Sequence, residues 1–451
     1  MTASGGETVP FHLRGNFAPV DEEVTASALE VRGAIPPELR GCYYRNGPNP
    51  KSGYSPHWFL GDGMVHGIAL EDGRALWYRN RWVRTRPFVE GDERAQLVRP
   101  DGTVDRTVAK ANTNVVCHAG RLLALVESSF PTELTRELDT RGIYDFGGRL
   151  STAMTAHPKL CPRTGEMHFF GYGFAPPYLV YHRVDAEGEL VQSEVIDVHG
   201  PTMAHDFAIT DRHVLFLDLP VVFDVQRALA GTMPYAWSDE YGARIGVMPR
   251  NGGVADLRWF EIEPCYVFHP LNAYADGERI VLDVARYPEL WRESPSDFRT
   301  AALHRYTLDL AAGTADEEPL DDQGIEFPRV DPRREGQPHR YGYAVRFASG
   351  PDEPAFHSLV QYDLARRSSA VHDFGPGRIP GEAVFVPATL DAAEDEGFAL
   401  ALVYDQARGA SDLVILDASG FEKPAVATVH LPRRVPFGFH GNWVPAEAWR
   451  D

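Results

Sequence analysis

The sequence predicts an all-β fold. Strand, turn and strand units recur along its 451 residues, and short strands lie between connections that draw on 35 prolines and 41 glycines. Both residue types favour turns and are depleted within strands. Segments with helix signals are few. Together these observations predict a chain of β-hairpins.

Four predicted hairpins begin at Met64, Tyr178, Leu303 and His357. In the first three the turn contains glycine, in the sequences EDG, AEG and AAG. Glycine supplies the positive φ that tight hairpin turns require, and the flanking runs are rich in Val, Ile, Leu and Tyr. Further short strands are predicted over residues 122–127, 213–219, 279–287 and 398–405.

Two segments carry helix signals. Residues 132–142 (TELTRELDTRG) and 224–231 (DVQRALAG) begin with a polar residue, continue with helix-forming residues and end at glycine. This order is typical of a short helix, with a capping residue before it and a stop after it. We therefore predict short helices at these two places.

The length of the chain bears on its architecture. Several four-stranded sheets around a central axis fit best, because radial repetition leaves only short strand edges exposed. No signature repeats from sheet to sheet, so a pair of β-sandwiches stays open on pattern alone. Since propellers routinely exceed the usual domain size, residues 1–451 are predicted to form one domain, with residues 1–14 as a flexible arm.

Composition narrows the class of partner. The formal net charge of −20 repels phosphate backbones, which argues against nucleic acid and favours a neutral small molecule. The cysteines form no CxxC pair, so neither a zinc knuckle nor a dense disulfide framework is indicated. The N-terminal residues lack the pattern of a signal peptide, and no apolar run approaches a membrane span, so we expect a cytoplasmic protein.

Four of the 17 histidines stand in a shared setting. Each follows a small or apolar residue and precedes Pro, Asp or Gly, in TAHPK (His157), MAHDF (His205), VFHPLNA (His269) and GFHGNW (His440). Their separations of 48, 64 and 171 residues exclude a metal motif on a single helix. A propeller axis lets such distant residues converge on one ion. On spacing alone, surface or hydrogen-bonded core histidines explain them equally well.

A resemblance makes this pattern specific. Seven segments between Gly15 and Trp443 resemble, in order, the signatures of the carotenoid cleavage oxygenase family: YYRNGPNP (43–50), HWFLGDGMVHG (57–67), ANTNVV (111–116), AHPK (156–159), HDFAIT (205–210), FHPLNA (268–273) and FHGNW (439–443). The resemblance covers nearly the whole chain and includes the four histidines. The chain is similar to bacterial members of this family.

The resemblance implies a fold and a metal centre. Family members are seven-bladed β-propellers with a dome of helices and loops over one face. They hold iron(II) on the propeller axis through four histidines, which match His157, His205, His269 and His440 here. Four neutral imidazoles leave two of six octahedral positions open, one of which can take dioxygen.

Three glutamates are implied to stand behind the histidines. In the family such glutamates accept the second imidazole N–H and so fix the orientation of the ring. The implied pairs are Glu127 with His205, Glu326 with His269 and Glu382 with His440, and His157 has none. Read without the family, each glutamate is equally well an exposed residue at the end of a strand.

The implied activity is that of an iron(II) dioxygenase, which uses dioxygen to cleave a C=C bond of an apolar alkene into two carbonyl products. Thr113 matches a family threonine close to the open metal positions. The family places Phe268, Phe327 and Phe439 near the substrate tunnel, although core packing explains a phenylalanine equally well.

One position bears on the substrate. Family members that cleave phenolic stilbenes or vinyl phenols carry a lysine just before the first supporting glutamate, where this chain has Val126. Because a buried valine cannot bind a phenolate, we expect a carotenoid or apocarotenoid. The alternative is a phenolic alkene held by another group, such as Tyr266, Tyr341 or Tyr343.

Several alternatives remain open at this point. Extraction of substrate from a membrane requires an apolar patch, for which LPVVFDV (219–225) is a candidate, unless it is a core strand. A non-cleaving isomerase and a silent binding scaffold are the other functional hypotheses. A calcium or zinc hydrolase is disfavoured, because such sites use carboxylate or amide oxygens or include an acidic ligand. The sequence does not determine an oligomeric state.

Overall fold

The backbone is almost entirely β-strand. The computed structural model describes residues 9–91, 95–99, 101–230, 232–294, 299–349 and 354–449. Within these ranges there are two short α-helices, α1 (Arg86–Glu90) and α2 (Val225–Leu229). The predicted all-β fold is confirmed.

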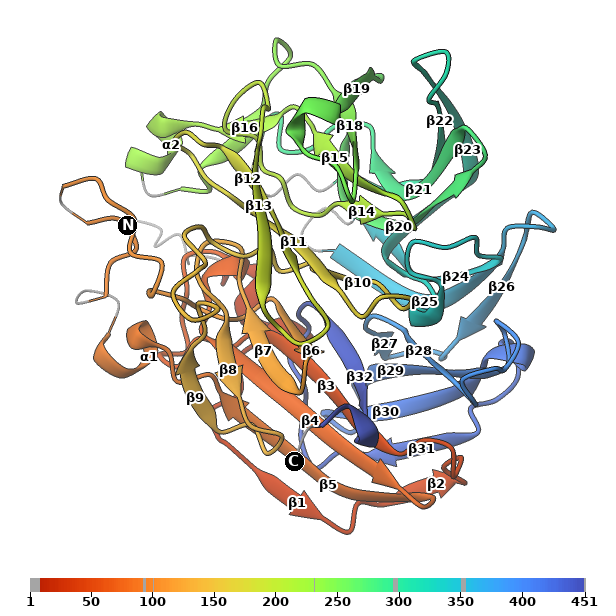
Figure 1. Cartoon of the computed structure of the whole chain (residues 1–451). Coiled ribbons are helices and arrows are strands. Elements are labelled where there is room, and N and C mark those ends of the chain that lie inside the picture. The colour runs from red at the N-terminus through yellow and green to blue at the C-terminus, as the bar shows by residue number, and fades with distance from the viewer. Residues whose placement is uncertain are drawn as a thin grey trace, which may run out of the picture.

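Antiparallel sheets stand around a common axis like the blades of a propeller (Figure 1). Blade 1 contains β1 (Thr25–Ser27), β5 (Arg74–Trp82), β4 (Gly63–Glu71), β3 (Gly41–Pro48) and β32 (Gly441–Pro445). Blade 2 contains β6 (Asn114–His118), β7 (Arg121–Leu125), β8 (Thr132–Leu134) and β9 (Thr140–Ile143). Blade 3 contains β10 (Lys159–Leu160), β11 (Met167–Tyr172), β12 (Leu179–Val184) and β13 (Leu190–Ile196).

The ring continues through four more blades. Blade 4 contains β14 (Ala208–Ile209), β15 (His213–Asp218), β18 (Arg244–Pro249) and β19 (Arg258–Glu261). Blade 5 contains β20 (Tyr266–Asp276), β21 (Arg279–Tyr287), β22 (Ala302–Asp309) and the first part of β23 (Thr314–Arg329). Blade 6 contains the last part of β23, β24 (Tyr341–Ser349), β25 (Pro354–Asp363) and β26 (Ser368–Asp373). Blade 7 contains β27 (Arg378–Pro380), β28 (Val384–Pro387), β29 (Gly397–Asp405), β30 (Ala410–Asp417), β31 (Ala427–His430) and β2 (Val31–Gly33).

Strands from both ends of the chain close the ring. β32 pairs with β3 in blade 1, and β2 pairs with β31 in blade 7. Closure in this way covers strand edges that would otherwise be open. Apolar side chains fill the spaces between neighbouring blades, as where Val65 and Leu122 share one cluster and Phe170 and Phe216 share another. The sequence-based alternative of two β-sandwiches does not apply.

The four predicted hairpins are confirmed as β4–β5, β12–β13, β22–β23 and β25–β26. The helix predicted over residues 224–231 is confirmed in α2, where the Asp224 side chain accepts from the N–H groups of Gln226 and Arg227. The helix predicted over residues 132–142 is wrong. That segment forms β8 and β9, because β8 pairs with β7 and buries Thr132 and Leu134, and this packing outweighs helix propensity.

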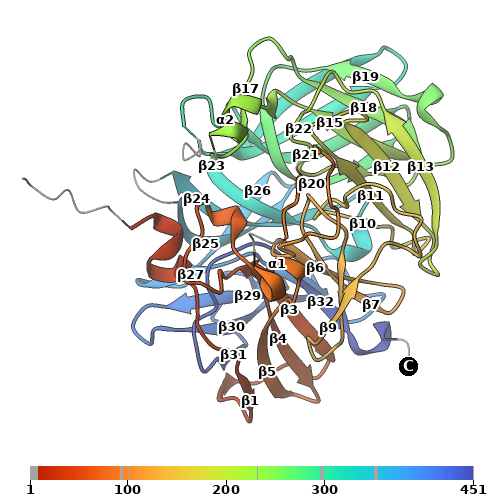
Figure 2. The ribbon, with the colours of Figure 1, turned by 90° about the vertical axis from the view of Figure 1, so that its left-hand side faces the viewer.

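Short helices, turns and a two-stranded ribbon lie over one face of the propeller, and we call these segments together the cover. In Figure 2, α2 and β17 (Tyr235–Trp237) lie on the left of the sheets with the red N-terminal turns, and the C-terminus lies on the right. β17 pairs with β16 (Val221–Phe223) as a separate ribbon. Of the predicted flexible arm, residues 1–8 lie outside the described residues, whereas the turn Phe11–Leu13 packs Phe11 against Trp58 at 5.9 Å. The packed chain therefore begins earlier than expected.

The segment over residues 219–225 has two parts. Leu219 and Val221 are buried, as a core strand would be, whereas Val225 is 55% exposed. Phe223 stacks on the partly exposed Phe174 at 5.1 Å. Among the described helices, none has both the length and the apolar character needed to cross a membrane.

Candidate active site

The four histidines singled out by their sequence setting meet at the propeller axis. The ring centroid of His157 lies 4.5 Å from that of His205, 5.0 Å from that of His269 and 4.6 Å from that of His440. His269 is 5.1 Å from His205 and 4.9 Å from His440. Side chains that are distant in the sequence thus form one compact, largely buried cluster.

Local backbone features place each ring. His157, His205 and His440 stand just before β10, β14 and β32, where the chain enters the inner strand of a blade. His269 lies within β20, whose register shifts between Val267 and Pro270. Pro270 has no N–H to donate, and a bulge at such a position redirects the neighbouring side chain. The bulge accounts for a histidine that points from the strand toward the axis.

Each of three histidines contacts one glutamate through Nδ1. The distances are 2.5 Å from His205 to Glu127, 2.6 Å from His269 to Glu326 and 3.0 Å from His440 to Glu382. With Nδ1 donating outward, the Nε2 atoms face the centre, and those of His205 and His269 lie 3.3 Å apart. The glutamates are not the exposed residues of the alternative interpretation, because their side chains are only 18%, 6% and 2% exposed.

A further layer of donors holds the glutamates. Tyr172 donates its hydroxyl to Glu127 at 2.5 Å, and Tyr287 donates to Glu326 at 2.6 Å. Glu382 accepts from Arg329 at 3.1 Å and from the backbone N–H of Gly441 at 2.9 Å. Tyr172, Tyr287 and Arg329 are not predicted from the sequence. Nothing in their local sequence distinguishes them from ordinary strand residues, since their role depends on pairing across blades.

Backbone strain accompanies one of these pairs. Phe327 follows Glu326 with φ of 52°, a left-handed conformation that is uncommon for bulky residues. Its N–H donates to the carboxylate of Glu326 at 2.6 Å. Such outliers persist only where the surroundings fix them, and they cluster at functional sites. The strained turn aims both the carboxylate and the phenyl ring at the histidines.

His157 differs from the other three. Its Nδ1 lies 3.9 Å from Asp206, which is itself paired with Lys159 at 2.9 Å. Its Nε2 is buried and makes no hydrogen bond among the described residues. Burial, together with the neighbouring His205, holds the pKa of His157 well below its ordinary value, and burial lowers the pKa of His440 to about 4 despite Glu382. These two rings are therefore neutral near pH 7, which is the form that binds a metal.

The donor set fits a metal ion. Ligand atoms of His157, His205 and His269 all lie within 4.8 Å of one another, and His440 completes the cluster. An unpartnered buried imidazole nitrogen is costly unless something binds it. Imidazole nitrogens held by outer carboxylates are the usual surroundings of zinc, iron and related transition metals.

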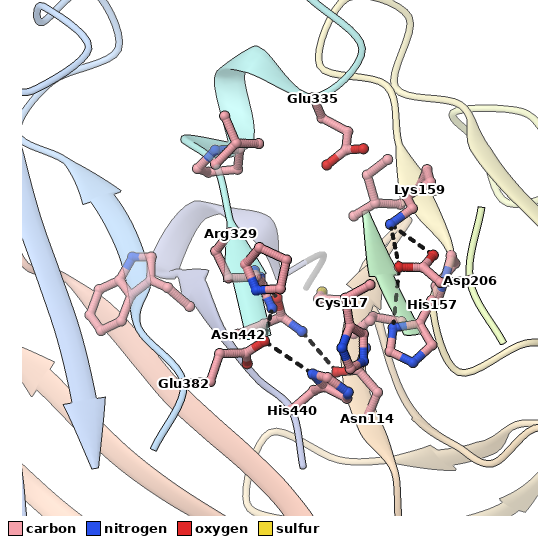
Figure 3. A pocket seen from close by; sticks show the side chains of 18 of the residues that line it. Asn114, Cys117, His157, Lys159, Asp206, Arg329, Glu335, Glu382, His440 and Asn442 are labelled. Atoms are coloured by element: carbon pink, nitrogen blue, oxygen red, sulfur yellow. Dashed lines mark hydrogen bonds and ion pairs between the residues drawn. The ribbon is translucent and has the colours of Figure 1, made fainter. Parts of the chain in front are cut away.

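A cavity of about 300 Å³, lined by both polar and apolar side chains, opens on one side of the cluster. His157, His269 and His440 lie along it, and every blade contributes a wall residue, so we call it the axial cavity. Figure 3 shows its charged and amide side chains, which include Lys159, Asp206, Arg329, Glu335, Glu382, Asn114 and Asn442.

Aromatic rings pack on other parts of the cluster. Phe268 meets His205 edge to face at 5.0 Å, and Phe327 lies 5.4 Å from His269. Phe439 packs on Trp58 at 4.8 Å. All three phenylalanines are less than 9% exposed, and none of them is among the residues that line the axial cavity. Phe268 and Phe327 lie against the histidines and all three phenylalanines pack in the core, whereas their place near a substrate tunnel stays a prediction.

The other residues that the sequence suggested for the site lie at different distances from the histidines. Thr113 donates its hydroxyl to Asn112, and its carbonyl accepts from the N–H of His440 at 3.1 Å. Val126 is half-buried rather than buried, because it lies at the end of β7 against the cluster between blades 1 and 2. Tyr266 packs on Phe268 at 4.9 Å, whereas Tyr343 of blade 6 stacks on Phe385 of blade 7. Tyr341, the first residue of β24, lies beside Arg340, which precedes the strand.

Comparison with known proteins identifies the family. A family model described as retinal pigment epithelial membrane protein matches residues 17–445. A carotenoid cleavage oxygenase of Mycobacterium tuberculosis (strain H37Rv) is 41% identical and covers 98% of this chain and 99% of its own. The chain belongs to the carotenoid cleavage oxygenase family.

Other members of the carotenoid cleavage oxygenase family agree with this fold. Carotenoid 9,10(9',10')-cleavage dioxygenase 1 of Arabidopsis thaliana is 34% identical over 98% of this chain and 92% of its own. The crystal structure of Pseudomonas brassicacearum lignostilbene dioxygenase matches with a TM-score of 0.87 at 30% identity, covering 97% of this chain and 100% of that one. Cobalt-substituted Synechocystis ACO matches with a TM-score of 0.84 at 28% identity, covering 95% and 97%.

Family membership confirms the predicted seven-bladed propeller and the predicted class of enzyme. The chain is an oxidoreductase, a dioxygenase that cleaves a carbon–carbon double bond, and it has a non-haem metal centre with histidine ligands. Residues in the family's signature segments form hydrogen bonds that hold the loops that carry the histidines. Asn46 donates its amide to the carbonyls of Ala111 and Asn114, and Asn114 in turn donates to that of Ala156 at 2.7 Å, next to His157.

Proposed function

We propose that this dioxygenase holds Fe(II) through His157, His205, His269 and His440 and cleaves a double bond of a carotenoid or apocarotenoid. The four Nε2 atoms are the donors, and Glu127, Glu326 and Glu382 keep three of the rings oriented. When bound, the metal supplies the binding and activation of dioxygen, and the alkene supplies the electrons.

The observation that carries the proposal is the surface that the chain places against the histidines. Phe268 and Phe327 touch the rings directly, and Trp291 packs behind Phe268 at 5.9 Å. Apolar aromatic walls suit a polyene, because they exclude water and hold one double bond without a polar anchor. In this proposal the phenylalanines orient the chain of the substrate, and the buried surroundings keep water from the reacting bond.

The polar groups nearest the histidines support a substrate without a phenol. The hydroxyls of Tyr172 and Tyr287 are occupied by glutamates, and that of Tyr266 donates to the carbonyl of Met203 at 2.9 Å. A buried phenol or phenolate needs a hydrogen-bond partner. Val126 offers none at the position where stilbene-cleaving members carry lysine. Cleavage of phenolic stilbenes remains the second candidate, because the lignostilbene dioxygenase shares the whole fold.

A substrate panel tests the proposal. The purified iron-loaded enzyme is incubated with β-carotene, apocarotenals, resveratrol and vinylguaiacol, and the product aldehydes are identified by mass. We expect cleavage of the polyenes with one dioxygen consumed per double bond broken. Cleavage of the phenols alone would support the second candidate, and isomerised product without oxygen uptake would identify a non-cleaving member.

We further place the enzyme in the cytoplasm, taking its substrate from a membrane surface. The four cysteines are unpaired, which suits a reducing compartment. The ribbon and α2 carry the apolar side chains of Phe223, Val225 and Leu229, of which Leu229 is 78% exposed, and Phe174, which follows β11, stacks on Phe223. Val225→Ser together with Leu229→Ser is expected to reduce cleavage of substrate in liposomes and to spare cleavage in detergent. Equal rates in liposomes would refute this route.

A further inference from the structure

The axial cavity has a floor, walls and a mouth. Its floor is formed by His157, His269 and His440, the same rings that make up the proposed metal centre. Leu160, which is 36% exposed, and the exposed Pro332 lie where it reaches the surface. Ala448 also lines it, and the C-terminal end of the chain lies on the side of the propeller away from α2 and β17 (Figure 2).

The charges inside this cavity do not balance. Lys159 pairs with Asp206, and Arg329 pairs with Glu382. Glu335 points into the cavity from above (Figure 3), and no direct ion pair or hydrogen bond reaches its carboxylate from any described residue. Burial near Asp206 raises the pKa of Glu335 above its ordinary value, although Lys159 works against this. A cation beside Glu335 would relieve this unbalanced charge.

The loop that carries Glu335 is rigidly held. Asn272 donates its amide to the carbonyls of Arg334 and Gln337 at 2.9 and 3.0 Å, and its oxygen accepts from the N–H of Gly336 at 2.9 Å. At the end of the loop, His339 lies 3.3 Å from the buried Asp283. One buried asparagine thus forms hydrogen bonds with backbone groups on both sides of Glu335. These bonds fix the loop, and the loop holds the carboxylate over the cavity.

The two approaches to the histidines differ in what they offer an ion. Toward the cover, Phe268, Phe327 and Phe439 contribute aromatic carbon to a packed core cluster. Along the axial cavity, the carboxylate of Glu335 can replace water molecules around a divalent ion, whereas the oxygens of Asp206 and Asn442 already accept from Lys159 and Arg329. The unpartnered Nε2 of the buried His157 stands at the end of this path.

We propose that the axial cavity is the route by which a divalent metal ion enters and leaves the histidine cluster, with Glu335 as the carboxylate that receives it. The inference rests on the proposed metal centre and does not depend on which alkene is cleaved. A route speeds entry and exit by the same factor, so it changes the rates of metal exchange and leaves the equilibrium affinity unchanged.

Cobalt(II) is a suitable probe, because its absorption reports occupancy of the histidines. Metal-free wild-type protein is mixed with Co²⁺ to measure uptake, and loaded protein is mixed with excess chelator to measure release. Glu335→Gln keeps the shape of the side chain and removes its charge. The matched control is Glu447→Gln, which removes an equal charge from an exposed position one residue before Ala448.

We expect Glu335→Gln to slow uptake by about tenfold, the low end of the increase in on-rate that a focused field gives, and to slow release by the same factor because the equilibrium affinity is unchanged. The Co²⁺ affinity measured at equilibrium stays at the wild-type value, and Glu447→Gln exchanges metal at the wild-type rate. Unchanged rates in Glu335→Gln would overturn the proposal. So would a faster release with weaker affinity, since this would make Glu335 an outer support of the bound ion. A wild-type protein that binds no Co²⁺ would instead refute the metal centre itself.

Discussion

The histidine cluster has two neighbourhoods of opposite chemistry. Phe268 and Phe327 pack edge or face against the rings within a large apolar core, whereas Lys159, Arg329 and Glu335 line a cavity that reaches the surface. The two neighbourhoods meet at His269 and His440, which line the cavity and also lie beside Phe327. From this difference we infer that the two sides of the histidine cluster serve different molecules, an apolar alkene where the walls are aromatic and a hydrated metal ion where the walls carry charged groups.

The strongest test concerns the histidines that both neighbourhoods share. His440→Ala removes one of four nitrogen donors, and we expect metal affinity to fall by more than the 10- to 100-fold cost of losing an outer partner. Activity is lost with it. Metal analysis of the purified variant measures the effect, with His213→Ala, a half-buried histidine on β15, as the control. Wild-type metal content in His440→Ala would refute the ligand assignment.

The second test concerns the polar side. Arg329→Met leaves Glu382, whose side chain is 2% exposed, without its cation. Breaking a buried ion pair from one side costs about 3 kcal/mol, and we expect this loss in the free energy of unfolding of the metal-free protein. Urea unfolding measures it. Arg40→Met is the control, because its pair with Glu71 is 59% and 42% exposed and is expected to cost about 1 kcal/mol or less. Equal losses in both variants would contradict the burial argument.

The third test separates the two sides by their effect on turnover. Phe268→Leu keeps an apolar side chain but removes the ring that meets His205. We expect kcat/KM for a polyene to fall by about tenfold, because small errors in substrate position are costly to rate. Metal content is expected to stay at the wild-type level. Leu160→Ala, at the mouth of the axial cavity, is the control and is expected to leave kcat/KM unchanged. A loss of metal in Phe268→Leu would show that the ring supports the ligand instead of the substrate.

The sequence predicts the hairpins of the fold from local signals, but it does not by itself predict how the histidines come together. Hairpins such as β4–β5 follow from alternating residues around a glycine turn, because these signals are local. The helix expected at residues 132–142 fails because pairing with β7, which no local signal reports, decides that segment. The histidines were selected by family motifs, since spacing alone could not bring together residues from separate blades.

Glu335 and Arg329, two charged residues along the axial cavity, are not predicted from the sequence. Glu335 lies in an ordinary loop sequence, and its place over the histidines depends on Asn272, a residue 63 positions earlier in the chain. Arg329 follows a proline near a strand end, and its local sequence is that of a surface residue. Its role comes from its contact with Glu382 of blade 7. Both owe their roles to contacts between blades. Only coordinates, and no periodicity or motif, reveal such contacts.

The smallest expected effect lies one layer behind the ligands. Tyr172 touches Glu127 at 2.5 Å and acts on His205 only through that carboxylate, so it is a positioning residue. Glu127→Gln is expected to weaken metal binding by about tenfold, the low end for an outer partner. Tyr172→Phe leaves the carboxylate in place and removes one hydrogen bond, so its effect on Co²⁺ affinity is expected to be smaller, with the same direction. Tyr343→Phe removes a similarly buried hydroxyl, bonded to Gln361, and is expected to leave that affinity unchanged. If Tyr172→Phe weakened binding more than Glu127→Gln, the order of these layers would be wrong, and the tyrosine would have to influence the histidines by a path other than Glu127.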